Sequence, residues 1–556
     1  MEQMTLFTMD RREPAAGKME IDRKSVEALG ADVEAGDGLL LVKHPLLQEF
    51  EYRRYQVDIA SEAVRHNTLV IAPTGLGKTR IAVLAAAKTM HDNPQKKILV
   101  LAPTKPLAEQ HALEFGGLFK GKKAGVYTGE SAPEERERIW SESDIVSATP
   151  QTVLNDVRRG RISLRDVSLM VVDEVHRATK DYQYVDLAEA FDGRIIGLTA
   201  SPGSGANRIE AVCRALKVEP EHIQIRTRDD DDVAPYIQYT KRNLVTVKRE
   251  EAGGVEKLIN DAYQASLVNL RRQLRDPELR DFRRGSDAAR KLIETPLQDV
   301  KQMGLLAVGE ELDLAITRAG GRYSDEKGEL MKAKSLQAEA MKLGHAVKVL
   351  PGYGIYTTRE YLMELGGDGS KASMRILKDK RITDALKIMD GLLLENRPTP
   401  KLEKTAELAK AEEGRVIVFA EYRDTVDQIV DHLRGKGVEA ERFIGQGEGG
   451  MTQKEQKDAL ARFKRGEFKA LVSTSIGEEG LDVPEVAAVI FFEPVADERR
   501  LIQREGRTGR HKPGKTYILM AEGSRDEATY WTGYWKWRKM RENIELMRKA
   551  GGRHVQ

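Results

Sequence analysis

Residues 72–79 read Ala72-Pro73-Thr74-Gly75-Leu76-Gly77-Lys78-Thr79; they follow an apolar run at 68–72 and precede a helical stretch. Glycines in such a loop let backbone N–H groups turn towards bound phosphates at the start of the helix, where anions are favoured. This pattern is a Walker A loop with alanine at its first position. It predicts that Lys78 reaches the β- and γ-phosphates of ATP and that Thr79 binds Mg²⁺. An ordinary glycine turn is the alternative, but the strand–loop–helix setting favours the phosphate site.

A second motif, Val171-Val172-Asp173-Glu174-Val175-His176, ends another apolar run. Asp173 is placed to hold Mg²⁺ through water, and Glu174 to polarise the attacking water as general base. Alone, an acidic pair after a strand is usually a solvated turn, but together with Lys78 it becomes specific. No second His or Cys stands near His176, which argues against a role as a metal ligand.

A third motif lies far downstream, at Gln503-Arg504-Glu505-Gly506-Arg507-Thr508-Gly509-Arg510. Arg507 and Arg510 are three residues apart, so they project from one side of a helix or turn. Such arginines can contact a phosphate and stabilise developing charge. A basic solvated helix is the common alternative. ATP bound between two lobes, however, would need its arginines from this second region.

Two regions alternate short Val/Ile/Leu runs with helical stretches, as in parallel sheets buried on both faces. The runs are residues 68–72, 97–102, 144–148, 169–172 and 195–198, then 415–420, 469–473, 487–492 and 515–520. Between them the pattern is helical, with a long helix ending near Pro351. The sequence therefore predicts an α/β protein with two parallel-sheet lobes and an all-helical domain inserted between them. We expect a flexible tail (1–38), an ATP-binding lobe (39–240), a helical insert (241–398) and a second lobe with a C-terminal helix (399–556).

Composition excludes some classes of protein. Lys plus Arg number 90 and Asp plus Glu 88, so any nucleic-acid surface must be local rather than global. The single cysteine, Cys213, excludes a disulfide framework and a cysteine-rich metal site and suits a reducing cytosol. No stretch has the apolar length needed to cross a membrane, and the N-terminus has no apolar signal core. We expect a cytoplasmic protein without a membrane partner.

Two further patterns leave alternatives open. The insert carries six arginines in a short stretch, which can track DNA phosphates. Interleaved acidic residues argue instead for a solvated helix face. Charge alone does not decide between DNA binding and a solvated face. The arginines are Arg271, Arg272, Arg275, Arg280, Arg283 and Arg284. Near the C-terminus, aromatic residues at 530–537 could stack on bases, but their helical spacing favours packing against a lobe.

In this order, the three motifs resemble the core of superfamily 2 DExH-box helicases, which have two RecA-like lobes. The resemblance implies that Gln56 reads adenine, that Arg53 stacks on it, that Asp482 lies near the ribose and that Gly480 also binds the nucleotide. It also implies that His176 couples the ATP site to the Gln503 motif. Other stretches that resemble the family's motifs are residues 102–107, 128–129, 148–151, 199–201, 418–422 and 473–482.

A narrower resemblance is to the Hef/FANCM helicases, archaeal and eukaryotic enzymes that act on stalled forks and branched DNA. It rests on residues 442–446, 451–456, 477–484 and 492–494, on the helical insert, and covers about residues 45–545. It tips the arginine cluster towards DNA binding, and it implies a nucleoid-associated protein of a prokaryotic or archaeal cell. We expect a monomer, with a sliding clamp or a nuclease as candidate partners. Archaeal Hef proteins commonly carry an XPF-type nuclease domain, and we find no Glu-Arg-Lys nuclease signature here.

Three functions are compatible with these motifs. The leading hypothesis is an ATP-dependent helicase or translocase acting on forked, branched or single-stranded DNA in DNA repair. An RNA-duplex-dependent ATPase of the Dicer or RIG-I type shares the core and a helical insert. A clamp that binds DNA and ATP without turnover would predict damage to Glu174, Arg507 or Arg510, and all three are present.

Overall fold

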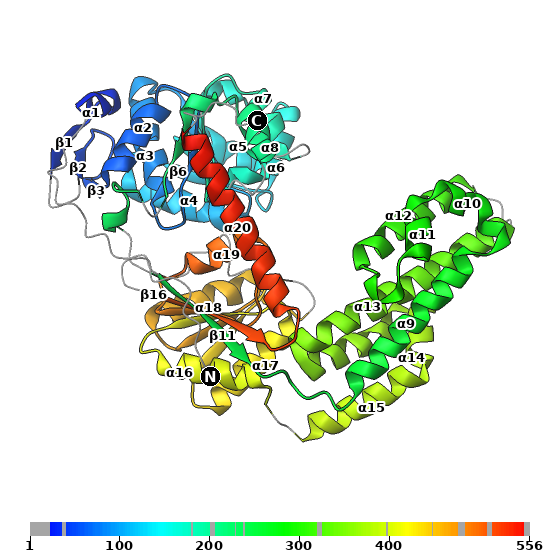
Figure 1. Cartoon of the computed structure of the whole chain (residues 1–556). Helices are drawn as coiled ribbons and strands as arrows, with labels where there is room; N and C mark the ends of the chain where they lie inside the picture. Colours follow the sequence, from blue (N-terminus) through cyan, green and yellow to red (C-terminus); the bar gives the residue numbers. More distant parts are fainter. Residues whose placement is uncertain are drawn as a thin grey trace.

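The computed structural model describes residues 23–35, 40–178, 182–200, 206–227, 230–236, 240–319, 325–395, 398–446, 449–475, 484–508 and 514–549. Two lobes, each built on a sheet, lie one above the other, and a helical domain projects from the lower one (Figure 1). Within these ranges, no helix combines the length and apolar character that a membrane crossing requires.

The first lobe is built on a seven-stranded parallel sheet in the order β10-β4-β9-β8-β5-β7-β6. All five runs expected in this region are strands. The edge strands β6 and β10 were not expected, because an edge strand has one neighbour and carries half-buried rather than continuously apolar residues. The strands are β4 (Thr68–Ile71), β5 (Lys97–Leu101), β6 (Ala124–Tyr127), β7 (Ile145–Ala148), β8 (Val167–Val172), β9 (Arg194–Thr199) and β10 (Ile223–Ile225).

Helices connect these strands, as parallel pairing requires. The connecting helices are α3 (Lys78–Asp92), α4 (Lys105–Leu118), α5 (Pro133–Glu142), α6 (Pro150–Arg158), α7 (Gln183–Glu189) and α8 (Ala206–Ala215), and α2 (Arg54–Ala63) precedes the first strand, β4. Buried side chains on the two faces of the sheet form two apolar clusters. The lobe is thus a layered α/β unit whose strands all point the same way.

The second lobe has a six-stranded parallel sheet in the order β11-β16-β15-β12-β14-β13. Its strands are β11 (Thr240–Val247), β12 (Val416–Phe419), β13 (Ala440–Phe443), β14 (Ala470–Ser473), β15 (Ala488–Phe491) and β16 (Gly514–Ala521), and its helices are α16 (Pro400–Ala411), α17 (Arg423–Gly435), α18 (Gln453–Arg465), α19 (Glu498–Glu505) and α20 (Asp526–Lys549). The four expected runs are all strands.

Strand β11 corrects the expected boundary of the insert at residue 241. It pairs with β16 over its whole length, from Thr240 opposite Gly514 to Val247 opposite Ala521, so it belongs to the second lobe. The sequence did not predict strand β11, because the strand begins with polar residues and lies at the edge of the sheet. The chain therefore enters the second lobe, leaves it for the insert and returns.

The insert is helical throughout its described residues and has its own apolar core, which includes Leu267, Leu305 and Ala340. Its helices are α9 (Val255–Leu274), α10 (Arg280–Gly285), α11 (Asp287–Glu294), α12 (Gln302–Arg318), α13 (Asp325–Glu364), α14 (Lys371–Lys378) and α15 (Lys380–Leu394). The helical run does not stop at Pro351 as expected. It is interrupted at Gly354, whose φ of 88° only glycine adopts readily.

Both ends of the chain differ from a simple two-lobe picture. Within the expected flexible tail, residues 23–29 form helix α1 (Arg23–Leu29), and β1 (Asp32–Ala35) pairs with β2 (Leu40–Lys43), which in turn pairs with β3 (Phe50–Tyr52). Leu29 is fully buried, which explains why this segment is ordered. At the other end, α20 runs from the second lobe to the first (Figure 1), where Met540 is buried in the first lobe's core.

Candidate nucleotide site between the lobes

Three neighbouring strands carry the first half of the site. Strands β4, β9 and β8 are adjacent and parallel, so their carboxyl ends lie at one edge of the sheet. The glycine loop follows β4, Thr199 ends β9, and Asp173 with Glu174 follow β8. This edge is where parallel α/β sheets bind ligands.

The loop at 72–79 has the shape of a phosphate cradle. Gly75 and Gly77 have φ values of 85° and 70°, and Lys78 begins helix α3. A Cβ on Gly77 would lie 2.4 Å from the Gln56 side chain, so no other residue fits there without movement. Lys78 folds over the loop and donates to the carbonyls of Ala72 (3.0 Å) and Pro73 (3.4 Å). These residues, with Thr79 in the first turn of α3, fit a triphosphate and its magnesium ion.

Asp173 is the buried anion of the site. Its carboxylate lies 2.8 Å from Nε2 of His111 and accepts the backbone N–H of Glu174 at 2.9 Å. Burial alone would raise the pKa of Asp173, but the hydrogen bond and charge of His111, helped by Lys78, keep that pKa below its usual value. The carboxyl is therefore ionised, as a group that holds Mg²⁺ through water must be. Sequence reasoning missed His111 because it lies on α4, 62 residues away.

Glu174 has a backbone conformation that non-glycine residues seldom adopt, with φ of 47°. Such strained residues gather at active sites, where the surrounding structure holds them. The Glu174 carboxylate lies 3.2 Å from Nδ1 of His176, and the same nitrogen lies 3.3 Å from the Thr199 hydroxyl. His176 thus connects the proposed general base to the end of β9, and it is not part of a His/Cys/Asp/Glu metal cluster among the described residues.

Gln56 and Arg53 close the other end of the glycine loop. The Gln56 amide donates to the Leu76 carbonyl at 2.9 Å and accepts the backbone N–H of Arg53 at 3.0 Å. Arg53 donates to the Tyr55 hydroxyl at 2.9 Å, and its guanidinium lies 5.2 Å from the ring centre of Tyr236. The aromatic Tyr236 at this end carried no sequence signal.

The third motif brings the second lobe to the glycine loop. Gly506, just after α19, lies so close to Thr74 that a Cβ on it would be 1.9 Å from the Thr74 hydroxyl oxygen. Gln503 is buried, and the Arg504 guanidinium is buried over the rings of Phe419 and Phe491. Arg504 therefore belongs to the second lobe's core. Of the other predicted site residues, Arg507 is described, and Gly480, Asp482 and Arg510 lie outside the described residues.

A bidentate ion pair fixes the helix that carries this motif. Arg242 of β11 contacts Glu505 through two hydrogen bonds of 2.7 and 2.8 Å, and its guanidinium lies 5.4 Å from the ring centre of Trp537. Burial alone would lower the pKa of Arg242, but the charge of Glu505 raises it. The three residues join β11, α19 and α20. Residue spacing could not reveal this contact, because the two charged partners are 263 positions apart.

The insert arginines divide into two groups. Arg271 of α9 donates to the Thr295 carbonyl at the end of α11, and Arg283 of α10 donates to the Leu274 carbonyl at the end of α9 at 2.8 Å. Both arginines therefore tie neighbouring helices together. The other four are exposed on and after the outer end of α9: Arg272, Arg275, Arg280 and Arg284. Helix α10 lies at the end of the insert that is farthest from the lobes (Figure 1).

The aromatic segment of α20 also divides. Tyr530 is buried in the second lobe's core, and Trp537 packs against the cores of both lobes. Trp531 and Trp535 remain 36% and 54% exposed on the outside of the helix. The expectation of packing is therefore confirmed for part of the segment only.

Three family models match the chain in the order that the structure shows. They are "DEAD/DEAH box helicase" over residues 53–209, "Putative ATP-dependent RNA helicase, helical bundle" over 269–391, and "Helicase conserved C-terminal domain" over 400–512. They correspond to the first lobe, the insert and most of the second lobe.

Known proteins resemble almost the whole chain. The crystal structure of the Pyrococcus furiosus Hef helicase domain is 38% identical, with a TM-score of 0.61, and the match covers 86% of this chain and 98% of that one. A "Putative ATP-dependent RNA helicase" of Methanocaldococcus jannaschii is 36% identical, covering 91% of this chain and 63% of the relative. The Fanconi anemia group M protein homolog of Mus musculus is 30% identical, covering 86% and 25% respectively. The chain thus spans less than two thirds of these curated relatives.

Proposed function

Because the chain belongs to the Hef/FANCM-like family of superfamily 2 ATP-dependent helicases, we propose that it is a DNA helicase or translocase that acts on forked or branched DNA in repair. The main support for this proposal is the close approach of Gly506 in the second lobe to Thr74 in the first. The contact supports the proposal because Gly506 belongs to the arginine motif of one lobe and Thr74 to the phosphate loop of the other. ATP binding can then change how the lobes sit relative to each other.

We assign the chemistry to residues that follow strands β4 and β8 of the first lobe and to two arginines of the second lobe. Lys78 binds the β- and γ-phosphates, and Glu174 takes the proton of the attacking water. Thr79 and Asp173 would hold Mg²⁺, which neutralises phosphate charge when bound. Arg507, with Arg510, stabilises the charge that develops on the γ-phosphoryl group. The ionised state of Asp173 and its contact with His111 support this assignment.

We assign recognition of branches to the insert. Helix α9 has 20 residues, so it reaches about 30 Å from the second lobe at about 1.5 Å per residue. The exposed arginines at its outer end can therefore contact a duplex arm that the lobes do not reach. Contacts of this kind are salt-sensitive and independent of sequence.

The direct test is stimulation of ATP hydrolysis by different nucleic acids at fixed salt. Single-stranded, duplex, forked and four-way DNA of equal length should be compared with matched RNA duplexes. We expect the highest stimulated rate of ATP hydrolysis with forked or four-way DNA. Equal stimulation by linear and branched DNA would remove the branch specificity and leave a general DNA motor.

An RNA-dependent ATPase is the second candidate. It is favoured by the names of the insert's family model and of the Methanocaldococcus jannaschii relative, both of which specify RNA. In contrast, a 31% identical relative from Neurospora crassa, of which the chain spans 41%, is named an ATP-dependent DNA helicase. Stimulation by RNA duplexes that exceeds stimulation by every DNA form would select this candidate.

The remaining expectations stay predictions. They are a monomeric state, a sliding clamp or a nuclease as partner, a cytoplasmic, nucleoid-associated location, and contacts of Gln56, Arg53, Gly480 and Asp482 with the nucleoside. A nucleotide-bound crystal structure would test the last set directly.

A further inference from the structure

Strand pairing brings two histidines together at the edge of the first sheet that is opposite the glycine loop. His66 lies two residues before β4, and His222 lies directly before β10. These strands pair in parallel with Ile223 opposite Leu69, so the residues before them lie side by side. The two imidazole rings are stacked, with centres 3.8 Å apart and an angle of 9° between their planes.

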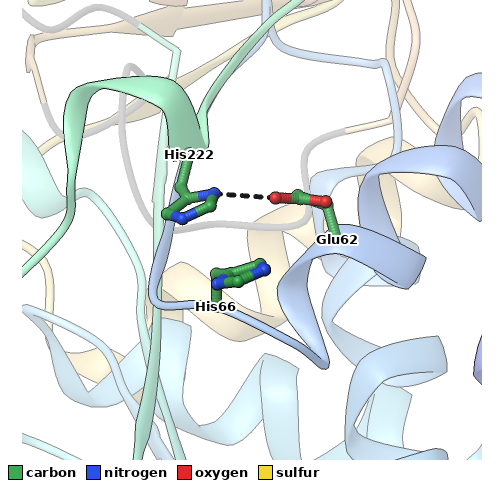
Figure 2. A group of neighbouring side chains, drawn as sticks. All are labelled: Glu62, His66 and His222. Atoms are coloured by element: carbon green, nitrogen blue, oxygen red, sulfur yellow. Dashed lines mark hydrogen bonds and ion pairs between the residues drawn. The ribbon is translucent and has the colours of Figure 1, made fainter.

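A carboxylate joins the pair from the last turn of α2. The backbone N–H of His66 donates to the Glu62 carbonyl at 3.0 Å, which continues the helical geometry and sets both side chains on one side of the turn. Oε1 of Glu62 lies 2.7 Å from Nδ1 of His222 (Figure 2). One nitrogen or oxygen from each of the three side chains lies within 4.8 Å of the others.

This donor set has a definite chemical preference. Two imidazole nitrogens and one carboxylate are the ligands of zinc sites that keep a fourth position for water. Mg²⁺ and Ca²⁺ prefer oxygen ligands and would bind two imidazoles poorly. The Glu62 and His222 side chains are 26% and 18% exposed, and His66 is exposed, so an ion can reach the group from solvent.

We propose that Glu62, His66 and His222 form a binding site for one zinc-like transition-metal ion, separate from the magnesium site of ATP hydrolysis. The ion would tie together α2, the start of β4 and the edge strand β10. Gln56 lies in the first turn of helix α2, and β4 is followed directly by the glycine loop. The site therefore stabilises the lobe from behind the nucleotide pocket and takes no part in the chemistry there.

The test is Zn²⁺ binding to the full chain after removal of metals with a chelator, without nucleotide. Calorimetric titration should give one tight equivalent, and Co²⁺ in its place should show the visible absorption of a site with nitrogen ligands. His66→Asn and His222→Asn should each weaken binding at least tenfold, because even the loss of an outer-shell partner costs ten- to a hundredfold. Zn²⁺ should also raise the thermal unfolding temperature of the unsubstituted chain.

The matched control is His432→Asn, which removes an imidazole that lies 3.7 Å from Glu403 in the second lobe. It should bind Zn²⁺ as the unsubstituted chain does. Far-UV circular dichroism checks folding, and the exposed position of His66 makes its variant the safer of the two. If the unsubstituted chain binds no Zn²⁺, or if the His66/His222 double variant binds it equally well, the cluster is only an ion pair with a stacked ring.

Discussion

The nucleotide site and the outer end of the insert differ in how their charges are held. At the nucleotide site, Asp173 is buried against His111, and Lys78 is held by loop carbonyls. At the insert's end, Arg272 and Arg280 are exposed. Buried, oriented charges act at fixed points in space and suit chemistry, whereas exposed charges act over a Debye length and suit binding to a charged polymer.

The difference predicts how each region responds to substitution. A single substitution at the nucleotide site should stop ATP turnover, because no neighbouring group can replace the one that is removed. Single changes at the insert should have small effects that accumulate, because each arginine contributes a similar, salt-dependent share.

The largest effect is expected for Glu174→Gln. Loss of the general base should reduce ATP turnover by about a hundredfold or more, while ATP binding is retained, since the substitution leaves the phosphate loop intact. Lys78→Ala should instead weaken ATP binding itself. Steady-state turnover and binding of a fluorescent ATP analogue separate the two, and near-normal hydrolysis by Glu174→Gln would contradict the assignment.

A smaller loss of ATP turnover is expected for Gly506→Ala. The new methyl group would meet the Thr74 side chain, so the second lobe could no longer approach the phosphate loop as closely. DNA-stimulated turnover should fall about tenfold, and by more than ATP affinity does, since the first lobe is unchanged. Gly435→Ala is the matched control, because a Cβ at that position of the second lobe meets nothing within 4 Å. Equal behaviour of the two variants would mean that this contact does not limit the reaction.

The insert should respond to a change of four charges together. Replacing Arg272, Arg275, Arg280 and Arg284 by Gln should weaken binding to forks and four-way junctions about tenfold. It should also reduce the slope of log affinity against log salt by about one for each lost phosphate contact. Binding to single strands should change less.

The control for that variant removes the same charge from another part of the insert: Lys371, Lys378, Lys380 and Lys387, all exposed on or beside α14 and α15. It should bind branched DNA nearly as the unsubstituted chain does. An equal loss in both variants would mean that net charge, and not the outer end of the insert, sets the affinity.

The smallest effect is expected for Glu493→Gln, which should change the thermal stability of the chain and how that stability depends on pH. Burial raises the pKa of Glu493 to about 8, Lys401 and Arg504 oppose the shift, and Glu421 and Asp526 add to it. Between about pH 4.5 and pH 8, Glu493 stays protonated in the folded chain but has lost its proton in the unfolded chain, where its pKa is lower. The free energy of unfolding therefore falls as the pH rises across this range. Glu493→Gln should raise the thermal unfolding temperature at pH 8 and change it little near pH 5. The same difference at both pH values would show that Glu493 is not protonated in the folded chain.

The sequence predicted the parts of the molecule that depend on local spacing. Residues 72–79 and 171–176 each lie within one strand–loop unit, so local spacing was enough to predict that Lys78 begins a helix and that Asp173 directly follows a strand. The continuous apolar runs of the central strands were equally informative, since burial on both faces requires them.

What the sequence could not predict depends on contacts between distant residues. The pairing of β11 with β16, the contact of His111 with Asp173 and the ion pair of Arg242 with Glu505 join positions that no local pattern connects. The division of the insert arginines also required the structure. Arg271 and Arg283 look like their neighbours in sequence, yet they bind backbone carbonyls.

We propose that this chain joins an ATP-driven motor to an insert that directs the motor to branched DNA. ATP-dependent remodelling of a labelled four-way junction, followed by gel electrophoresis, measures the motor and the insert in one experiment. The unsubstituted chain should convert the junction, Glu174→Gln should bind it without converting it, and the four-arginine variant should hydrolyse ATP on single strands yet convert the junction slowly. Conversion by the four-arginine variant at the unsubstituted rate, with binding also unchanged, would contradict the account.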